Sequence, residues 1–198
     1  DLRRRGVRQQ LLLEISARMN MLQHPEEVYA LLCRESTELL SADCGCLYWN
    51  DARQRTLYRL AEYNLPEDSF PIAHGEGVIG KVAESGEALL VEEYAAWPGR
   101  LRRARETPPP YSALGVPVLW QGAVQAVLVV FSRRKERTFS NEDKDLLALL
   151  AHLASGVMAN TRLLEQESRQ RRLSDSLRRT TLMLNASLEL EQVYDHLL

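Results

Sequence analysis

The stretch HGEGVIGKVAESGEALLVEE, residues 74–93, holds three glycines spaced as G-x-G-x-x-G and then an apolar run that ends in two glutamates. Dinucleotide-binding folds use this spacing to turn a strand into a helix whose N-terminus faces a pyrophosphate. Here the preceding residues make a poor strand, and the helix predicted over 79–84 is too short for that role. We therefore predict that Gly75, Gly77 and Gly80 supply positive φ and close packing rather than an NAD site. A helix N-terminus that binds a small anion stays open as the alternative.

The apolar pattern around this stretch predicts helices at both ends of the chain and short strands between them. Helical spacing covers residues 7–22, and a second helix begins at Pro25, where proline and two glutamates suit the first turn. A period of two predicts strands at 44–49, 56–63, 88–91, 112–120 and 123–132. Gln121-Gly122 between the last two is a hairpin signal, and Asn50-Asp51 is the predicted turn after the first.

This order of elements predicts an α+β domain rather than alternating βαβ units. We expect a central antiparallel sheet with helices on one face and a short helix and long loop over the other. From Ser140, which Asp143 follows at the spacing of a capping box, the pattern is helical again. Apolar residues then recur at heptad spacing past residue 160, which predicts a coiled coil.

Bulk composition excludes several classes of protein. The net charge of −2 provides no global basic field for nucleic acid, and the longest apolar run is much too short for a membrane span. Three cysteines are too few for a disulfide scaffold and indicate a reducing compartment, so we predict a cytoplasmic protein. The chain also looks like a piece of a longer protein, because it starts without Met and stops inside a helical pattern.

Three segments together resemble the GAF domain family, over about residues 25–159. GEGVIGKVAESGEALLVEEY resembles the mid-domain signature, YSALGVPVLWQGAVQAVLVVFS the central hairpin, and RTFSNEDKDLLALLAHLASGVMANTRL the start of the last helix. The resemblance implies a five- or six-stranded antiparallel sheet, as in GAF and PAS domains, with a ligand pocket on one face. It also implies a bacterial sensor or dimerisation module tethered to an effector such as a histidine kinase of a two-component system, a cyclic-di-GMP enzyme or a transcriptional activator.

The resemblance to a GAF domain divides the chain into four predicted parts. Residues 1–24 form an N-terminal dimerisation helix, 25–159 the GAF domain and 160–188 a coiled-coil signalling linker. Residues 189–198 begin a possible second GAF-like domain, because a shift of the chain by 165 positions aligns five identical residues. The five residues in the first copy are Asn20, Glu26, Val28, Tyr29 and Leu32.

The resemblance is incomplete where cyclic-nucleotide binders of the family carry an Asn-Lys, Phe, Asp-Glu pattern. Ser132-Arg133 stands in place of Asn-Lys, Phe139 and Asp143 fit, and Lys144 replaces the glutamate. These departures argue against a cyclic nucleotide, although an ion pair between Arg133 and Asp143 would keep the structural link.

Other cofactors of the family also find no convincing motif. The Cys-His dipeptide of bilin-binding members is missing from the sequence. His74 and His152 are possible haem ligands, but surface or interface histidines are the commoner case. The cofactor therefore remains unknown.

The three cysteines could in principle support thiol-dependent catalysis, an interpretation that we do not favour. Cys44 and Cys46 share one face of a strand, Cys33 lies on a helix, and buried cysteine most often acts as a small hydrophobe. A zinc site would need a second ligand pair, so no metal is predicted. Some free methionine sulfoxide reductases are stand-alone GAF proteins that use thiolates, which leaves a thiol enzyme as a minor alternative. We predict no catalytic residues and a protein that is not an enzyme.

Aromatic side chains lie next to arginines in the long connection 92–111, where Tyr94, Trp97 and Tyr111 bracket Arg100 and its neighbours. Rings and guanidinium groups together bind organic anions, whereas a solvated charged segment with anchoring aromatics is the alternative. We predict a small-molecule site between this connection and the sheet. The predicted ligand-binding residues are Cys46, Tyr48, Gly77, Val78, Tyr94, Trp97, Arg100, Tyr111 and Leu114.

The predicted function is that of a sensor that binds a small ligand and transmits its state through parallel helices of a homodimer. A degenerate GAF domain that only dimerises and spaces other domains is the alternative. The predicted dimer interface consists of Leu12, Ile15, Met19, Leu150, Leu153, Val157, Asn160 and Leu164. We expect a C-terminal effector domain as a partner, and neither nucleic acid nor membrane.

Overall fold

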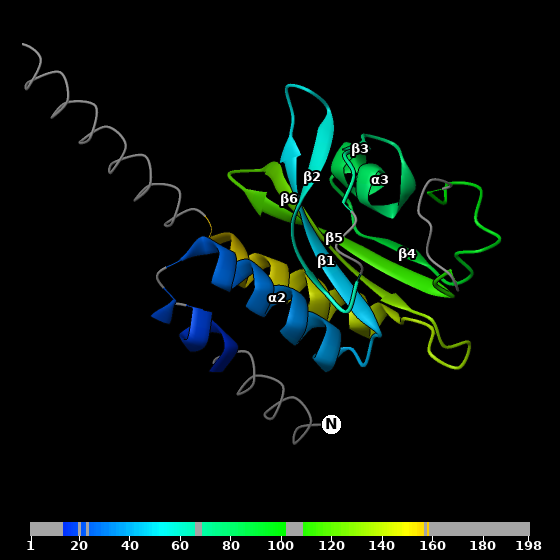
Figure 1. Cartoon of the computed structure of the whole chain (residues 1–198), viewed down its shortest axis with the longest axis horizontal. Coiled ribbons are helices and arrows are strands. Elements are labelled where there is room, and N and C mark those ends of the chain that lie inside the picture. Colours follow the sequence, from blue (N-terminus) through cyan, green and yellow to red (C-terminus); the bar gives the residue numbers. More distant parts are fainter. Residues whose placement is uncertain are drawn as a thin grey trace, which may run out of the picture. The chain divides into compact units, whose positions relative to one another are not determined.

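The computed structural model describes residues 14–19, 21–22, 24–65, 69–101, 109–156 and 158 (Figure 1). A six-stranded antiparallel sheet with the order β3-β2-β1-β6-β5-β4 lies at the centre. Its strands are β1 (Cys44–Asp51), β2 (Thr56–Tyr63), β3 (Ile72–Ala73), β4 (Leu89–Val91), β5 (Ser112–Trp120) and β6 (Ala123–Ser132). The α+β prediction is therefore confirmed. The short strand β3 is additional, since no strand was predicted between residues 63 and 88.

Both faces of the sheet are covered, as Figure 1 shows. Helix α2 (Pro25–Leu39) and the helix formed by residues 141–156 pack on one face, and helix α3 (Gly77–Ser85) packs on the other. Period-two alternation along β1 sends Leu47 to the first face and Cys46 and Tyr48 to the second. We call the two resulting clusters of buried side chains the α2-side core and the α3-side core.

The starts of the two long helices follow their sequence signals. Pro25 occupies the first turn of α2 beside Glu26 and Glu27. At the other helix, the Ser140 Oγ accepts a hydrogen bond from the Asp143 N–H (3.2 Å), and the Asp143 carboxylate accepts one from the Ser140 N–H (2.8 Å). This reciprocal pair is the predicted capping box, and it satisfies two backbone donors that the helix itself leaves free.

The hairpin between β5 and β6 turns at Gln121 and Gly122, which have φ values of 49° and 80°. Two consecutive positive φ values match the turn type that fits the twist of adjacent strands, so the hairpin signal is confirmed. Pro117 lies two residues beyond Gly115, the last β5 residue that pairs with β4. The register between β5 and β6 shifts shortly after it, between Val118 and Leu119. Proline is tolerated there because no β4 residue needs its missing N–H.

The turn between β1 and β2 differs from the prediction. Asn50 and Asp51 still belong to β1, and the chain reverses over residues 52–55. The Asp51 carboxylate organises this reversal, because it accepts hydrogen bonds of 3.0 Å from the N–H groups of Arg53 and Gln54. The sequence correctly predicted a turn after the first strand but placed it two residues too early. The Asp51 side chain shapes the turn that follows it rather than one that contains it.

Part of the predicted dimer seam is core of the domain instead. Ile15, Met19 and Leu150 are fully buried in the α2-side core, which leaves none of them free to face a second copy. Leu153 is half-buried. Heptad spacing identified an apolar stripe correctly, but at Leu150 that stripe is buried in the core of the same chain. Leu12, Val157, Asn160 and Leu164 lie outside the residues whose side chains the structure describes, as do the linker 160–188 and the possible second domain 189–198.

None of the helices in the described part of the chain has the length and apolar character that crossing a membrane requires.

Candidate functional site

The glycine motif forms the turn that places α3 over the sheet. Gly75 and Gly77 have φ values of 80° and 63°, and the Gly75 N–H donates to the Gly80 carbonyl at 2.9 Å. A Cβ on Gly80 would lie 2.2 Å from the Ala73 carbonyl oxygen, so only glycine fits there. The prediction that these three glycines serve the backbone is confirmed.

The connection that follows β4 packs over α3 through aromatic side chains. Tyr94 is buried, with its ring centroid 5.9 Å from that of Trp97 and 6.2 Å from that of Phe131 on β6. Its hydroxyl oxygen accepts a hydrogen bond of 3.2 Å from the Leu101 N–H. A Cβ on Gly77 would be in van der Waals contact with Leu101, at 3.4 Å, which brings the glycine turn and the connection together.

Two cationic side chains border this aromatic cluster. The Lys81 Nζ on α3 lies 5.7 Å from the centre of the Trp97 ring, and the Arg100 guanidinium donates to the Ala95 carbonyl at 2.6 Å. Both side chains belong to exposed residues, whereas Trp97 is half-buried. The arrangement joins an aromatic face to fixed positive charge, a combination that attracts organic anions. Lys81 was not among the predicted site residues, because its contact with Trp97, sixteen positions further along the chain, depends on the fold.

All but one of the predicted ligand-binding residues lie on the α3 side of the sheet. Cys46, Tyr48, Val78 and Tyr94 lie together in the α3-side core, and Trp97 packs against them. Gly77, Arg100 and Tyr111 border the same region through the contacts of the glycine turn and the connection. Leu114 is different, because alternation along β5 turns its side chain into the α2-side core on the opposite face.

His74 is fixed by a neighbouring amide. Asn50 donates through Nδ2 to the Val124 carbonyl (2.9 Å), so its Oδ1 is the atom that faces the His74 Nε2 at 2.7 Å. The neutral imidazole therefore carries its proton on Nε2 and donates to Asn50. Burial and the Arg55 guanidinium lower the pKa of His74, and the Glu84 carboxylate opposes them. Asn50 therefore links β1 to β6 through Val124 and to the residue before the glycine turn through His74.

All three cysteines are reduced and buried. Cys44 and Cys46 share the α3-side core with Tyr48, as the strand period predicted, while Cys33 lies in the α2-side core. Burial, with a smaller contribution from the Glu62 carboxylate, raises the pKa of the Cys33 thiol to about 12. Cys33 is therefore a protonated, hydrophobic side chain at neutral pH. Among the described residues, no group of three metal-ligating side chains lies together.

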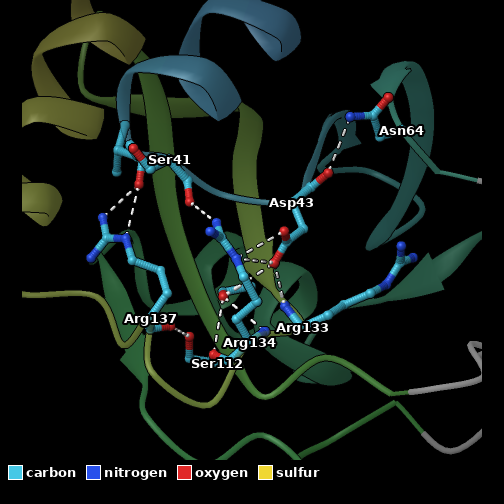
Figure 2. Close-up of polar contacts among 9 residues, drawn as sticks. Ser41, Asp43, Asn64, Ser112, Arg133, Arg134 and Arg137 are labelled. Atoms are coloured by element: carbon cyan, nitrogen blue, oxygen red, sulfur yellow. Dashed lines mark hydrogen bonds and ion pairs between the residues drawn. The ribbon is translucent and has the colours of Figure 1, made fainter.

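A polar junction ties the end of β6 and the loop after it to the segment between α2 and β1 (Figure 2). The Asp43 carboxylate accepts from the Arg133 N–H (2.7 Å) and pairs with the Arg134 guanidinium (3.1 Å). Asp143 pairs with Arg137 at 3.0 Å, so the expected Arg133–Asp143 ion pair was wrong. The arginine four positions further along reaches Asp143 because residues 133–139 form a loop outside β6.

Both carboxylates of this junction are held in the charged form. Burial alone would raise the pKa of Asp43, but hydrogen bonds from Arg133, Ser132 and Arg134 lower it overall. The pKa of Asp143 is lowered in the same way, against burial, by hydrogen bonds from Arg137 and Ser140.

The sequence profile of the GAF domain matches residues 23–159, about two thirds of the chain. The chain belongs to the GAF domain family. GAF domains are small-molecule-binding or regulatory modules of signalling proteins. The predicted GAF identity is thereby confirmed.

Solved structures with this fold come from proteins of different activity. The GAF domains of the phosphoenolpyruvate-protein phosphotransferases of Acinetobacter and Coxiella burnetii are 21% and 22% identical, with TM-scores of 0.71 and 0.73. They align over 81% and 80% of this chain and 98% and 96% of theirs. The free methionine-R-sulfoxide reductase of Neisseria meningitidis, solved with its substrate, is 19% identical with a TM-score of 0.70, over 80% and 92%.

The reductase corrects the prediction that this chain is not an enzyme. That prediction treated the GAF fold as a sensor fold unless a catalytic motif was visible, yet the Neisseria enzyme performs catalysis on the same architecture. At this level of identity the likeness shows the fold alone. The GAF domain therefore does not decide between enzyme and sensor.

Proposed function

We propose that this GAF domain is a sensor module that binds a small organic anion on the α3 side of its sheet. The observation that carries the proposal is the cluster of Lys81 on α3 with Tyr94, Trp97 and Arg100 on the connection after β4. An anion that stacked on Trp97 would gain the charges of Lys81 and Arg100 and would hold residues 94–100 of the connection against α3. The cytoplasm, which the sequence predicts, is the compartment proposed for it.

The energetics of this site favour a ligand with both a ring and a negative charge. A cation over an aromatic face contributes about 0.5–1 kcal/mol when exposed to solvent and more when desolvated. Lys81 and Trp97 already make such a contact at 5.7 Å, so a flat anion would extend an existing stack. An apolar ligand would gain nothing from the two cations.

A thermal-melt screen of the full chain against nucleotides, amino acids and tetrapyrroles tests the proposal. The proposal expects at least one anionic compound to raise the melting temperature of the wild-type chain. Trp97→Ala and Lys81→Gln should each reduce that shift. Arg53→Gln, which alters an exposed cation on the β1–β2 turn, is the matched control and should leave it unchanged.

A degenerate GAF domain that binds nothing is the second candidate, and one observation favours it. Trp97 and Leu101 pack against the α3-side core, so protein side chains already occupy the face where a ligand would lie. No shift with any compound of the screen would support this spacer and dimerisation role and contradict the sensor.

The homodimer and the effector belong to the same proposal. The helix formed by residues 141–156 exposes 43% of Leu149, next to half-buried Leu153, on the side away from the sheet. Since Ile15, Met19 and Leu150 are buried within the domain, this outer stripe is the interface that we propose. A histidine kinase of a two-component system, a cyclic-di-GMP enzyme or a transcriptional activator is the proposed effector in the full-length protein.

A further inference from the structure

Arg137, which is labelled in Figure 2, joins the end of α2 to the cap of the 141–156 helix. Its Nε and one terminal nitrogen donate to the Leu40 carbonyl at the end of α2, at 3.0 and 2.6 Å. The other terminal nitrogen donates at 3.0 Å to Asp143, which caps the 141–156 helix. The guanidinium also lies 5.0 Å from the ring centre of buried Phe139. The forked donor set of arginine makes the two polar contacts possible at the same time, and its planar face lies against the ring.

The backbone of the same residue is connected to the candidate ligand site. The Tyr94 N–H donates to the Tyr111 carbonyl, and the Tyr111 N–H donates to the Ser132 carbonyl, both at 2.7 Å. The adjacent Ser112, which is fully buried, donates through Oγ to the Arg137 carbonyl at 3.0 Å. A hydrogen-bonded route therefore runs from the connection after β4, through the start of β5, to the cap of the 141–156 helix.

We propose that Arg137 is a positioning residue that couples the connection after β4 to the N-terminal cap of the 141–156 helix. Displacement of Tyr94 and Tyr111 moves Ser112, Ser112 moves Arg137, and Arg137 pulls on Asp143. The two-state element is the capping box, which is either closed, with Ser140 and Asp143 paired, or open. In its physiological direction this coupling rests on the proposed function, because a ligand would supply the displacement.

Comparison with the neighbouring Arg134 shows why we give the coupling role to Arg137. Arg134 pairs with Asp43 at 3.1 Å and donates to the Ser41 carbonyl at 2.5 Å, so it ties β6 to the segment between α2 and β1. In the described part of the chain, its side-chain partners are Asp43 and Ser41, and neither belongs to the cap of the 141–156 helix. Arg134 and Arg137 carry the same charge within one loop but make different connections. Arg134, whose side chain is 53% exposed against 24% for Arg137, is therefore the comparison in the experiment.

Hydrogen exchange on the full chain tests the coupling without any ligand. Trp97→Ala loosens the connection after β4, and the amide exchange of residues 140–144 is then measured by mass spectrometry. We expect exchange at this cap to become roughly two- to tenfold faster, the range that follows from loss of one hydrogen bond. In the Arg137→Gln background, Trp97→Ala should leave exchange at the cap unchanged, whereas in the Arg134→Gln background it should act as in the wild type.

The coupling is overturned if Trp97→Ala leaves the cap unchanged in the wild type, or if its effect is equal in both arginine variants. If Arg137→Gln does not fold, Ser112→Ala breaks the same route by removing a single oxygen and takes its place. A failed thermal screen would contradict ligand binding and leave this result intact, so the two proposals fail separately.

Discussion

Gly80 is the residue on which the glycine turn depends most directly. A methyl group there would overlap the Ala73 carbonyl oxygen, since a Cβ would lie only 2.2 Å away. We expect Gly80→Ala to lower the free energy of unfolding by about 1–3 kcal/mol, the usual range for overpacking. Gly156→Ala is the control, because a Cβ on that helical glycine meets nothing within 4 Å, and alanine there should stabilise the helix slightly. Urea denaturation of both variants measures the contrast, and an equal effect would contradict this account.

Cys33 gives the stability of the domain a dependence on alkaline pH. Burial raises the pKa of its thiol from 9.0 to about 12, so between these values the unfolded chain loses the proton and the folded chain keeps it. The contribution is fully present below pH 9.0 and is lost as pH rises toward 12, by up to about 1.4 kcal/mol for each pH unit.

Comparison with Cys33→Ala isolates this contribution from the titration of other groups. Denaturant midpoints between pH 8 and pH 11 should fall more steeply for the wild type than for the variant. Parallel curves would show that the thiol ionises equally in both states.

At the scale of elements, the cap of the 141–156 helix is the feature whose loss is easiest to measure. Ser140→Ala removes the oxygen that accepts the Asp143 N–H, and we expect a loss of about 1 kcal/mol in the free energy of unfolding. Ser140→Thr keeps a hydroxyl and should retain most of the stability. If both variants lose the same amount in urea, the side-chain oxygen contributes nothing to the cap.

Local signals in the sequence predicted elements well and neighbours in space poorly. The hairpin at Gln121-Gly122 and the capping box at Ser140 were predicted correctly because each depends on residues adjacent in the chain. The partner of Asp143 was not, because Arg133 and Arg137 are equally plausible until the path of the loop is known. Lys81 was missed for the same reason, and β3 was missed because two residues carry no periodicity.

For the whole molecule, the outer face of the 141–156 helix decides whether the proposed homodimer forms. Leu149→Glu should convert a dimer of the full chain to a monomer in light scattering, because it places a charge at the centre of the proposed interface. Ala148→Glu, at the neighbouring exposed position, is the control for added charge and should weaken association less. A wild-type chain that is monomeric at all concentrations would contradict the dimer outright.

The apolar stripe of that helix also shows where prediction from sequence stops. A heptad pattern states which side chains lie on one stripe, but not whether a sheet of the same chain or a second chain covers it. Leu150 and Leu149 are adjacent, yet one is buried and the other exposed. Leu114 and Ala113 divide between the two cores in the same way, which is why one predicted ligand contact lies on the far face.

The position of Pro117 has a consequence for the behaviour of this protein in a crowded solution. β5 continues to Trp120 while β4 pairs with it only as far as Gly115, so the outer part of β5 lacks a β4 partner. An unpaired strand edge is a template on which other chains add and aggregate. A strand that added there would meet a residue with no N–H to donate, so the proline acts as a gatekeeper against misassembly.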